Sequence, residues 1–264
     1  MERCLRSIAD QTYQNIETIV VDSNSDDGTI EIAKRFNAQV YHAPSLSSAR
    51  LEAITRSKGF YVFLVDSDQV VDKDAVSECV DLCQRYGFNA VTLFERALVI
   101  KNTTAERVMA YDKWLIHSNK DDDVIYGAAI PRFFQASLLD GIKIPPNLVA
   151  FDHNLLYAAT SGRVRVGFLD TNIYHHEPSS WSEIARKFFR YGQYYSYAFS
   201  FDRKLVAFHS MPRRTYFSKS VLKEPNLIPG IAFLYCVKVV AAFCGTLTSV
   251  LDRWSTTVKQ KRQE

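Results

Sequence analysis

Two aspartates separated by one serine end a short apolar run, and their spacing could serve metal chemistry. The stretch Phe60–Val71 reads FYVFLVDSDQVV. Alternate residues of an extended chain point to the same side, so Asp66 and Asp68 can face one bound ion or its ligand. Mg²⁺ and Mn²⁺ prefer carboxylate oxygens and share their remaining positions with substrate phosphates. The alternative is a helix cap, in which Asp or Ser accepts backbone N–H bonds.

The elements around these carboxylates alternate between strand and helix. The expected strands are residues 16–21, 39–42, 61–65 and 89–94, and the expected helices are 2–9, 30–36, 47–57 and 74–86. Strands separated by helices of this length imply parallel βαβ units, whose active sites gather at the carboxyl ends of the strands. Asp22 ends the run IETIVV, just as Asp66 ends its own strand. We therefore expect an α/β fold with a mostly parallel sheet flanked by helices, and a metal or nucleotide site at one edge.

The middle of the chain is less regular. A Gly-Ala-Ala turn at 127–129 and Arg132 precede an expected apolar helix, and Phe151-Asp152-His153 opens another helix through Ala159. Residues 164–168 and 172–176 resemble strands, and the Pro-Ser-Ser sequence at 178–180 is typical of a helix start, here for residues 181–191.

Composition excludes several classes of protein. The 264 residues are 47% hydrophobic and 23% charged, with a net charge of +3, which predicts one large domain and no overall nucleic-acid signature. Five cysteines without a C-x-x-C pair give no disulfide framework and favour a reducing compartment. Cys79 and Cys83 could be metal ligands, but a buried helix face is favoured. The alternation of charged and apolar residues from Met1 indicates a helix rather than a signal peptide.

The C-terminal part has a different character. Residues 203–223 carry six cations and no acid, and residues 227–251 then contain a single charge, Lys238. An apolar run of this length can span or enter a bilayer, and Trp254 suits its interface. A lysine at the centre of a span costs about 3 kcal/mol on insertion scales, so a re-entrant or surface-lying helix and a soluble hydrophobic hairpin are alternatives.

The order of several motifs resembles family 2 glycosyltransferases of the GT-A fold. These motifs are IETIVVDSNSDDGT, LSSARLEAITRSKGFYVFLVDSD, AFDHNLL, YHHEPSSW and RKFFRYG, and they cover about 190 residues. The resemblance implies an inverting transferase that uses a nucleotide-diphosphate sugar and a divalent metal, Mn²⁺ or Mg²⁺. A bound cation would stabilise the leaving diphosphate as a Lewis acid.

On the donor side, the resemblance assigns five residues. Asp22 would contact the nucleobase with Ser23 beside it, and Arg50 would lie near the nucleotide. Asp66 would face the ribose side and the metal, and Asp68 the metal and the diphosphate. The alternative for the pair of aspartates remains the helix cap described above.

On the acceptor side, Asp152 matches the position of the catalytic base, although Phe151 replaces the acid that usually precedes it. Such a base deprotonates the acceptor hydroxyl for in-line attack. His175 or His176 matches the histidine that can complete the metal or diphosphate site, and one of them is expected to be structural. Arg190, with its neighbouring cations, could neutralise phosphates. A helix cap at Asp152 and a solvated helix face at Arg190 are the alternatives.

One departure from the family pattern concerns the start of the chain. Family members begin with a strand and a P-T-Y-N-like loop, whereas Met1 falls inside the first expected helix. We expect the first strand to be absent, which would leave the edges of the IETIVV and YVFLVD strands unpaired.

These observations lead to one main hypothesis and two rivals. The main hypothesis is a metal-dependent glycosyltransferase at the cytoplasmic face of the cell membrane, which passes sugar to a lipid-linked or glycan acceptor. Residues 1–200 would form the catalytic domain, and residues 201–264 a basic, aromatic linker with a membrane-associating helical segment. The rivals are a nucleotidyltransferase, which usually needs a Gly-rich loop that is not seen, and an inactive membrane-tethered scaffold that binds nucleotide sugar.

Overall fold

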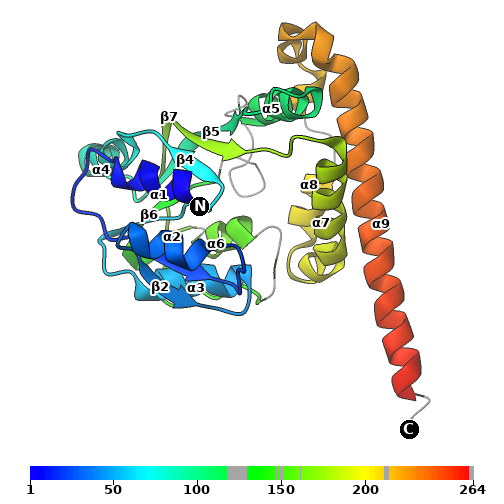
Figure 1. The fold of residues 1–264 in the computed structure, drawn as a ribbon, viewed down its shortest axis with the longest axis horizontal. Coiled ribbons are helices and arrows are strands. Elements are labelled where there is room, and N and C mark those ends of the chain that lie inside the picture. The colour runs from blue at the N-terminus through cyan, green and yellow to red at the C-terminus, as the bar shows by residue number, and fades with distance from the viewer. Residues whose placement is uncertain (118–129, 147, 149–151, 161, 211–213, 262–264) are drawn as a thin grey trace. The chain divides into compact units, whose positions relative to one another are not determined.

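The computed structural model describes residues 1–117, 130–146, 148, 152–160, 162–210 and 214–261 (Figure 1). Their contacts divide the chain into two units. The sheet unit comprises residues 1–98, 120–148 and 152–176, and the helical unit comprises residues 99–119, 149–151 and 177–264. Each unit has its own hydrophobic cores.

Seven strands build the described part of the sheet unit. Two of them, β1 (Ile19–Asp22) and β2 (Gln39–His42), pair with each other in parallel. The other five form one sheet in the order β3-β6-β5-β7-β4. Their bounds are β3 (Tyr61–Phe63), β4 (Gln69–Val71), β5 (Ala90–Leu98), β6 (Phe133–Gln135) and β7 (Val166–His176). The two strand-like stretches expected after residue 163 are therefore one strand, β7.

The sheet is mixed, which corrects the expectation of a mostly parallel one. β5 and β7 are parallel, but β6 runs antiparallel to both β3 and β5, and β4 runs antiparallel to β7. The expectation counted only strands joined by crossover helices. β4 instead follows β3 after a short turn, and β6 enters between β3 and β5 from the opposite end.

Strand β6 replaces the helix that we expected after Arg132. Phe133 and Phe134 are 1% and 0% exposed, and they belong to the two different cores on the two faces of the sheet. Neighbouring side chains point to opposite faces only in an extended chain, so this double burial favours a strand. The 3₁₀ turn Ala136–Leu138 follows. The Gly-Ala-Ala turn expected at 127–129 lies outside the described residues.

Helices flank the sheet on both faces, as expected. They are α1 (Glu2–Ala9), α2 (Thr29–Arg35), α3 (Leu46–Arg56), α4 (Ala75–Tyr86) and α6 (Asp152–Thr160). Cys79 and Cys83 lie on the face of α4 that packs into one of the cores, and they are 0% and 4% exposed. The prediction that they form part of a buried helix face is confirmed. α3 and α6 supply side chains to the core on the other face.

Among the described strands, four have a neighbour on one side only: β1, β2, β3 and β4. Within the described part of the chain, β1 pairs only with β2, and β3 pairs only with β6. The unpaired edges that we expected for β1 and β3 are therefore present.

The helical unit consists of α5 (Thr104–His117), α7 (Trp181–Phe201), α8 (Arg203–Ser210) and α9 (Ile228–Lys261), with short 3₁₀ turns before α9. Those turns are Arg214–Phe217, Lys219–Lys223 and Pro225–Leu227. α7 packs against α9 and belongs to the helical unit. The boundary that we expect at residue 200, between a catalytic domain and a membrane-associating segment, stays a prediction. Among the described residues, one helix is long and apolar enough to cross a membrane, Pro225–Asp252, with a mean hydropathy of 2.1.

Candidate functional site

Asp66, just beyond β3, is held by two arginines. Arg50 of α3 donates from Nη2 to Asp66 Oδ1 at 3.1 Å, and Arg132 donates from Nη1 to Oδ2 at 2.9 Å. Burial raises the pKa of Asp66, but the charges of Arg132 and Arg50 outweigh it and hold that pKa well below its usual range. The carboxylate is therefore ionised at neutral pH.

Arg50 also binds Asp152, the first residue of α6. Its Nε donates to Asp152 Oδ2 at 2.7 Å, so one guanidinium bridges two carboxylates that are 86 positions apart in the sequence (152 minus 66). Asp152 is 5% exposed. Burial raises its pKa, but the charge of Arg50 outweighs that effect and lowers it. Asp152 is thus an ionised carboxylate with one oxygen engaged by Arg50.

Arg132 lies at the centre of this group, and the sequence analysis did not assign it to the site. Besides Asp66, its guanidinium contacts Glu95 of β5, with Nη2 at 3.5 Å from Oε2, and the ring of His153. Burial lowers the pKa of Arg132, but the charges of Asp66 and Glu95 outweigh it and raise that pKa. The sequence did contain a signal for this role, because Arg132 directly precedes the apolar pair Phe133-Phe134. A cation next to buried residues needs a carboxylate partner.

His153 follows Asp152 and was also missed. Its Nε2 lies 3.0 Å from Arg132 Nη1 and 3.4 Å from Asp66 Oδ2. A guanidinium only donates, so Nε2 accepts and the proton of the neutral ring lies on Nδ1. Nδ1 is buried and has no hydrogen-bond partner among the described residues. Burial, followed by the charges of Arg132 and Arg50, lowers the pKa of His153 and keeps the ring neutral.

Asp68 and His175 form a second pair. Antiparallel pairing of β4 with β7 brings His176 N to 3.0 Å from Asp68 O, and His175 Nε2 lies 3.2 Å from Asp68 Oδ2. Of the two candidate histidines, His175 therefore has its ring against Asp68. The side chain of Asp68 is 50% exposed, so it is open to a ligand from solution.

A carboxylate oxygen beside an imidazole nitrogen suits a divalent cation that also takes oxygens from a phosphate. Within the described residues, no group of three or more His, Cys, Asp and Glu side chains could hold a metal alone. Such a cation would therefore need the ligand's own oxygens. Asp66 fits this role less well than Asp68, because its two oxygens already neutralise two guanidinium groups.

The remaining predicted residues make none of the contacts described above. Asp22 ends β1, is 5% exposed and accepts from Ser25 N at 3.0 Å. Hydrogen bonds from Ser25, first from its side chain and then from its backbone, lower the pKa of Asp22. Its neighbour Ser23 is exposed. Arg190 lies on α7 in the helical unit, and Phe151 lies outside the described residues.

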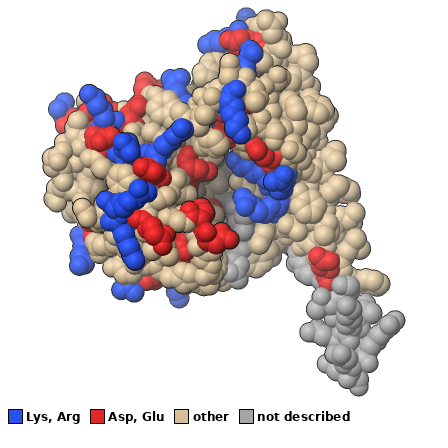
Figure 2. Space-filling view, viewed as in Figure 1, with Lys and Arg blue, Asp and Glu red and all other residues tan. Residues whose placement is uncertain are grey.

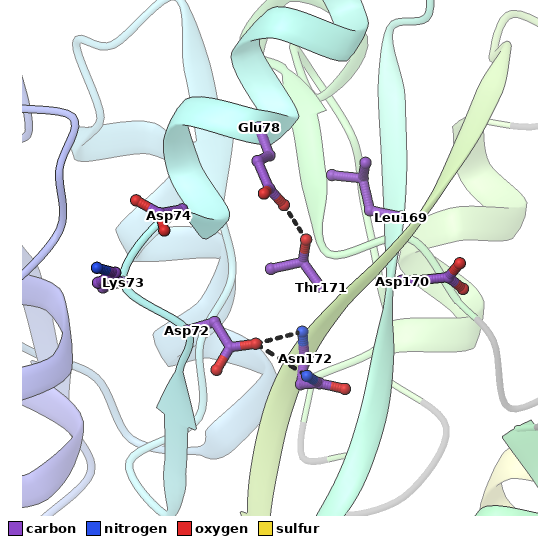
Figure 3. Close-up of a pocket in the computed structure, with 8 residues that line it drawn as sticks. All are labelled: Asp72, Lys73, Asp74, Glu78, Leu169, Asp170, Thr171 and Asn172. Carbon is purple, nitrogen blue, oxygen red and sulfur yellow. Dashed lines mark hydrogen bonds between the residues drawn. The ribbon is translucent and has the colours of Figure 1, made fainter.

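A hollow of about 590 Å³ lies at the far end of β4 from Asp68 (Figure 3). Two of its acidic side chains are hydrogen-bonded to β7: Asp72 Oδ2 accepts from Asn172 N at 3.0 Å and from Asn172 Nδ2 at 2.9 Å, while Thr171 donates to Glu78. These bonds hold β7 at residues 170–172, where its pairing with β5 shifts register. The two arginines and the histidine of the Asp66 group do not line this hollow.

Comparison with known proteins identifies the fold and the family. The mannosyltransferase PcManGT of Pyrobaculum calidifontis, solved with GDP-Man and Mn²⁺, covers 95% of this chain and 83% of its own at 15% identity, with a TM-score of 0.61. TarS of S. aureus, solved with UDP-GlcNAc, covers 94% and 87% at 14% identity, with a TM-score of 0.54. Both likenesses confirm the expected GT-A α/β fold.

Sequence comparison gives closer but shorter matches. The glycosyltransferase GlyA of Streptococcus pneumoniae is 37% identical over 83 residues, which are 29% of this chain and 12% of GlyA. The chain thus spans only a small part of this curated relative. The model of glycosyl transferase family 2 matches residues 1–133, just over half of the 264 residues. That match includes Asp22, Arg50, Asp66 and Asp68, and the chain therefore belongs to the family 2 glycosyltransferases.

Proposed function

We propose that the chain transfers a sugar from a nucleotide diphosphate to an acceptor hydroxyl with inversion at the anomeric carbon. One observation carries the proposal. The network of Arg50, Asp66, Arg132 and Asp152 lies next to the Asp68–His175 pair in a chain of glycosyltransferase family 2. PcManGT and TarS were solved with nucleotide-sugar donors, which supports a donor of the same class here.

Several residues would share the contacts with the donor. Asp22 and Ser23 would contact the nucleobase and Asp66 the ribose, whereas Arg190 would neutralise phosphate charge. Asp68 and His175 would hold a divalent cation, Mn²⁺ or Mg²⁺, and a cation at that place supplies Lewis-acid stabilisation of the leaving diphosphate. The half-exposed carboxylate of Asp68 supports this assignment.

Asp152 would accept the proton of the acceptor hydroxyl while that oxygen attacks the anomeric carbon and the nucleotide diphosphate leaves. Its lowered pKa keeps it in the basic form at neutral pH, although the same shift weakens it as a base. Arg50 fixes Oδ2 at 2.7 Å, so the carboxylate has one defined orientation. Oδ1 would then be the oxygen that faces the acceptor.

The acceptor and the location belong to the same proposal. The acceptor would be a lipid-linked molecule or a glycan at the cytoplasmic face of the cell membrane. Among the described helices, the one long and apolar enough to cross a membrane follows the basic stretch 203–223, which supports this location. The anionic leaflet attracts juxtamembrane cations by about 1 kcal/mol each.

The donor site is tested by calorimetry of the full chain with UDP- and GDP-sugars, with and without Mn²⁺. Asp68→Asn should weaken donor binding at least about tenfold in Mn²⁺ and remove the benefit of the ion, because a coordinating charge is lost. Asp81→Asn is the matched control, since Asp81 of α4 has the same 50% exposed side chain. Donor binding by Asp68→Asn that equals binding by the control would refute the proposed site.

A further inference from the structure

α9 presents one apolar face to its surroundings. The exposed side chains of this face recur every three, four or seven residues, as expected for one side of a helix. Each is 47–68% exposed, and they are Phe233, Val240, Phe243, Leu247, Leu251 and Trp254. Only 22% of the most apolar window of the helix is buried. α9 is therefore unlike the core helix of a soluble protein, in which most of such a window is buried.

The single charge within this apolar run is turned away from the exposed face. Lys238 Nζ lies 2.5 Å from Asp112 Oδ2 of α5, and the two side chains are 16% and 5% exposed. Tyr216 donates a further hydrogen bond to Asp112. The ion pair neutralises the lysine inside the helical unit, so the exposed face carries no charge between Phe233 and Leu251.

The opposite side of α9 packs directly against α7. Thr246 Oγ1 donates to Gly192 O at 2.9 Å, and a Cβ atom at Gly245 would lie 2.0 Å from Phe189 O. The two backbones therefore touch, and no side chain separates them. Because the two helices are in backbone contact, α7 moves together with α9 if α9 enters a bilayer.

This packing bears on how α9 could meet a bilayer. α7 carries three cations, Arg186, Lys187 and Arg190. If α9 crossed the membrane with α7 attached, these cations would enter the hydrocarbon at about 2.5–3.5 kcal/mol each, or roughly 8–10 kcal/mol together. A helix that lies along the surface avoids this cost, because α7 then remains on the aqueous side.

A groove between α7 and α9 adds a cation to the apolar surface. It has a volume of about 580 Å³, and its lining is apolar except for Arg186, which is exposed. The other lining residues are Ala185, Phe189, Phe233, Cys236, Val237, Val240 and Ala241. The part of the helical unit that faces the viewer in Figure 2 likewise has long uncharged stretches. An apolar channel with a guanidinium at its edge complements a lipid with an anionic headgroup.

We infer that α9 lies flat in the interface of an anionic phospholipid bilayer, with the Phe233–Trp254 face among the lipid chains. The α7–α9 groove takes an acyl chain, and Arg186 lies beside the headgroup phosphate. The inference rests on the proposed membrane association and specifies its geometry: both ends of the chain remain on one side of the membrane. Trp254 fits this arrangement, since its amphipathic ring is favoured at the interface.

The first test measures binding of the full chain to vesicles of phosphatidylcholine with and without phosphatidylglycerol. Phe243→Glu should lower the partition coefficient at least about tenfold, because it places a charge in the contact face. Phe60→Glu is the matched control, since Phe60 in the sheet unit is 68% exposed and Phe243 is 66% exposed. Arg186→Gln should weaken binding to anionic vesicles and leave binding to neutral vesicles unchanged.

Three outcomes of this test contradict different statements. Wild-type protein that stays in the supernatant with both kinds of vesicle overturns the membrane association itself. Equal binding of Phe243→Glu and the Phe60→Glu control overturns the assignment of the face. If Phe243→Glu instead converts a dimer into a monomer without weakening vesicle binding, the face is an interface between two copies, and the inference is wrong.

The second test concerns topology and separates a flat helix from a spanning one. The full chain is expressed with short epitope tags at both ends, and a protease is applied to inverted and to right-side-out membrane vesicles. A helix lying flat leaves both tags exposed on the same side. Removal of the two tags from opposite sides shows that α9 spans the membrane, which overturns this inference but leaves the proposed membrane association intact.

Discussion

Replacement of Arg132 by methionine would test whether the buried network stabilises the sheet unit. The side chain of Arg132 is 14% exposed and contacts the side chains of Asp66 and Glu95, which are 28% and 15% exposed. Loss of one partner of a buried ion pair costs about 3–5 kcal/mol, because the remaining charge is left unpaired. Arg50 still compensates Asp66 in the variant, so we expect a cost near the lower limit, about 3 kcal/mol.

Chemical denaturation followed by circular dichroism measures this cost. Arg85→Met is the matched control: Arg85 Nε lies 2.7 Å from Asp81 Oδ1, but the side chains are 67% and 50% exposed. Exposed pairs of this kind contribute about 0.2–1 kcal/mol. Adding Glu95→Gln to Arg132→Met should recover part of the loss, because it neutralises a carboxylate that is only 15% exposed and has lost the charge of Arg132. A cost for Arg132→Met no larger than that of the control would refute the idea that the network is a buried, mutually dependent set.

Three further predictions follow from other parts of the molecule. Asp152→Asn should lower turnover about 10²–10⁴-fold but leave donor affinity nearly unchanged, because asparagine can still accept from Arg50; equal losses in both would limit Asp152 to positioning Arg50. Gly245→Ala should destabilise the protein by about 1–3 kcal/mol in thermal unfolding, because the new Cβ would clash with the backbone carbonyl of Phe189. This cost should exceed the gain from the higher helix propensity of alanine, so a stabilised variant would disprove the close packing of α7 and α9. Burial raises the pKa of Cys4 and Cys83 to about 11, so these thiols are not reactive at neutral pH. A brief maleimide pulse at neutral pH should therefore label only the two exposed thiols, as counted by mass spectrometry. Labelling of more than two cysteines would contradict the described burial. Those exposed thiols are Cys236 and Cys244.

Local patterns predicted most of the elements. The β-branched run before Asp22, the apolar run before Asp66 and the amphipathic stretch of α4 form the expected strands and helix, with ends that differ by a few residues. These predictions succeed because alternation and helical periodicity report which side of an element is buried, and burial is decided by neighbouring residues. The same patterns mark Asp66 and Asp68 as carboxylates at the end of a strand.

Partners distant in sequence were not predictable from these patterns. Arg132 is 66 positions from Asp66, and Arg50 is 102 positions from Asp152. A single charged residue has no periodicity, so its sequence does not indicate which opposite charge it will meet. Strand β6 was missed for a related reason: three residues are too few to distinguish alternation from a helical turn, and only the sheet neighbours on both sides make the extended form favourable.

The amino-acid sequence by itself thus determined the α/β class, the family and the carboxylates at the strand ends, since these depend on local burial patterns and on motif order. Tertiary structure alone decided which charges pair and which face of α9 is free. Lys238 shows the difference. In the sequence it interrupts an apolar run at a cost of about 3 kcal/mol for a membrane span. In the folded chain it meets Asp112, which is 126 positions away, because packing against α5 brings that carboxylate within 2.5 Å.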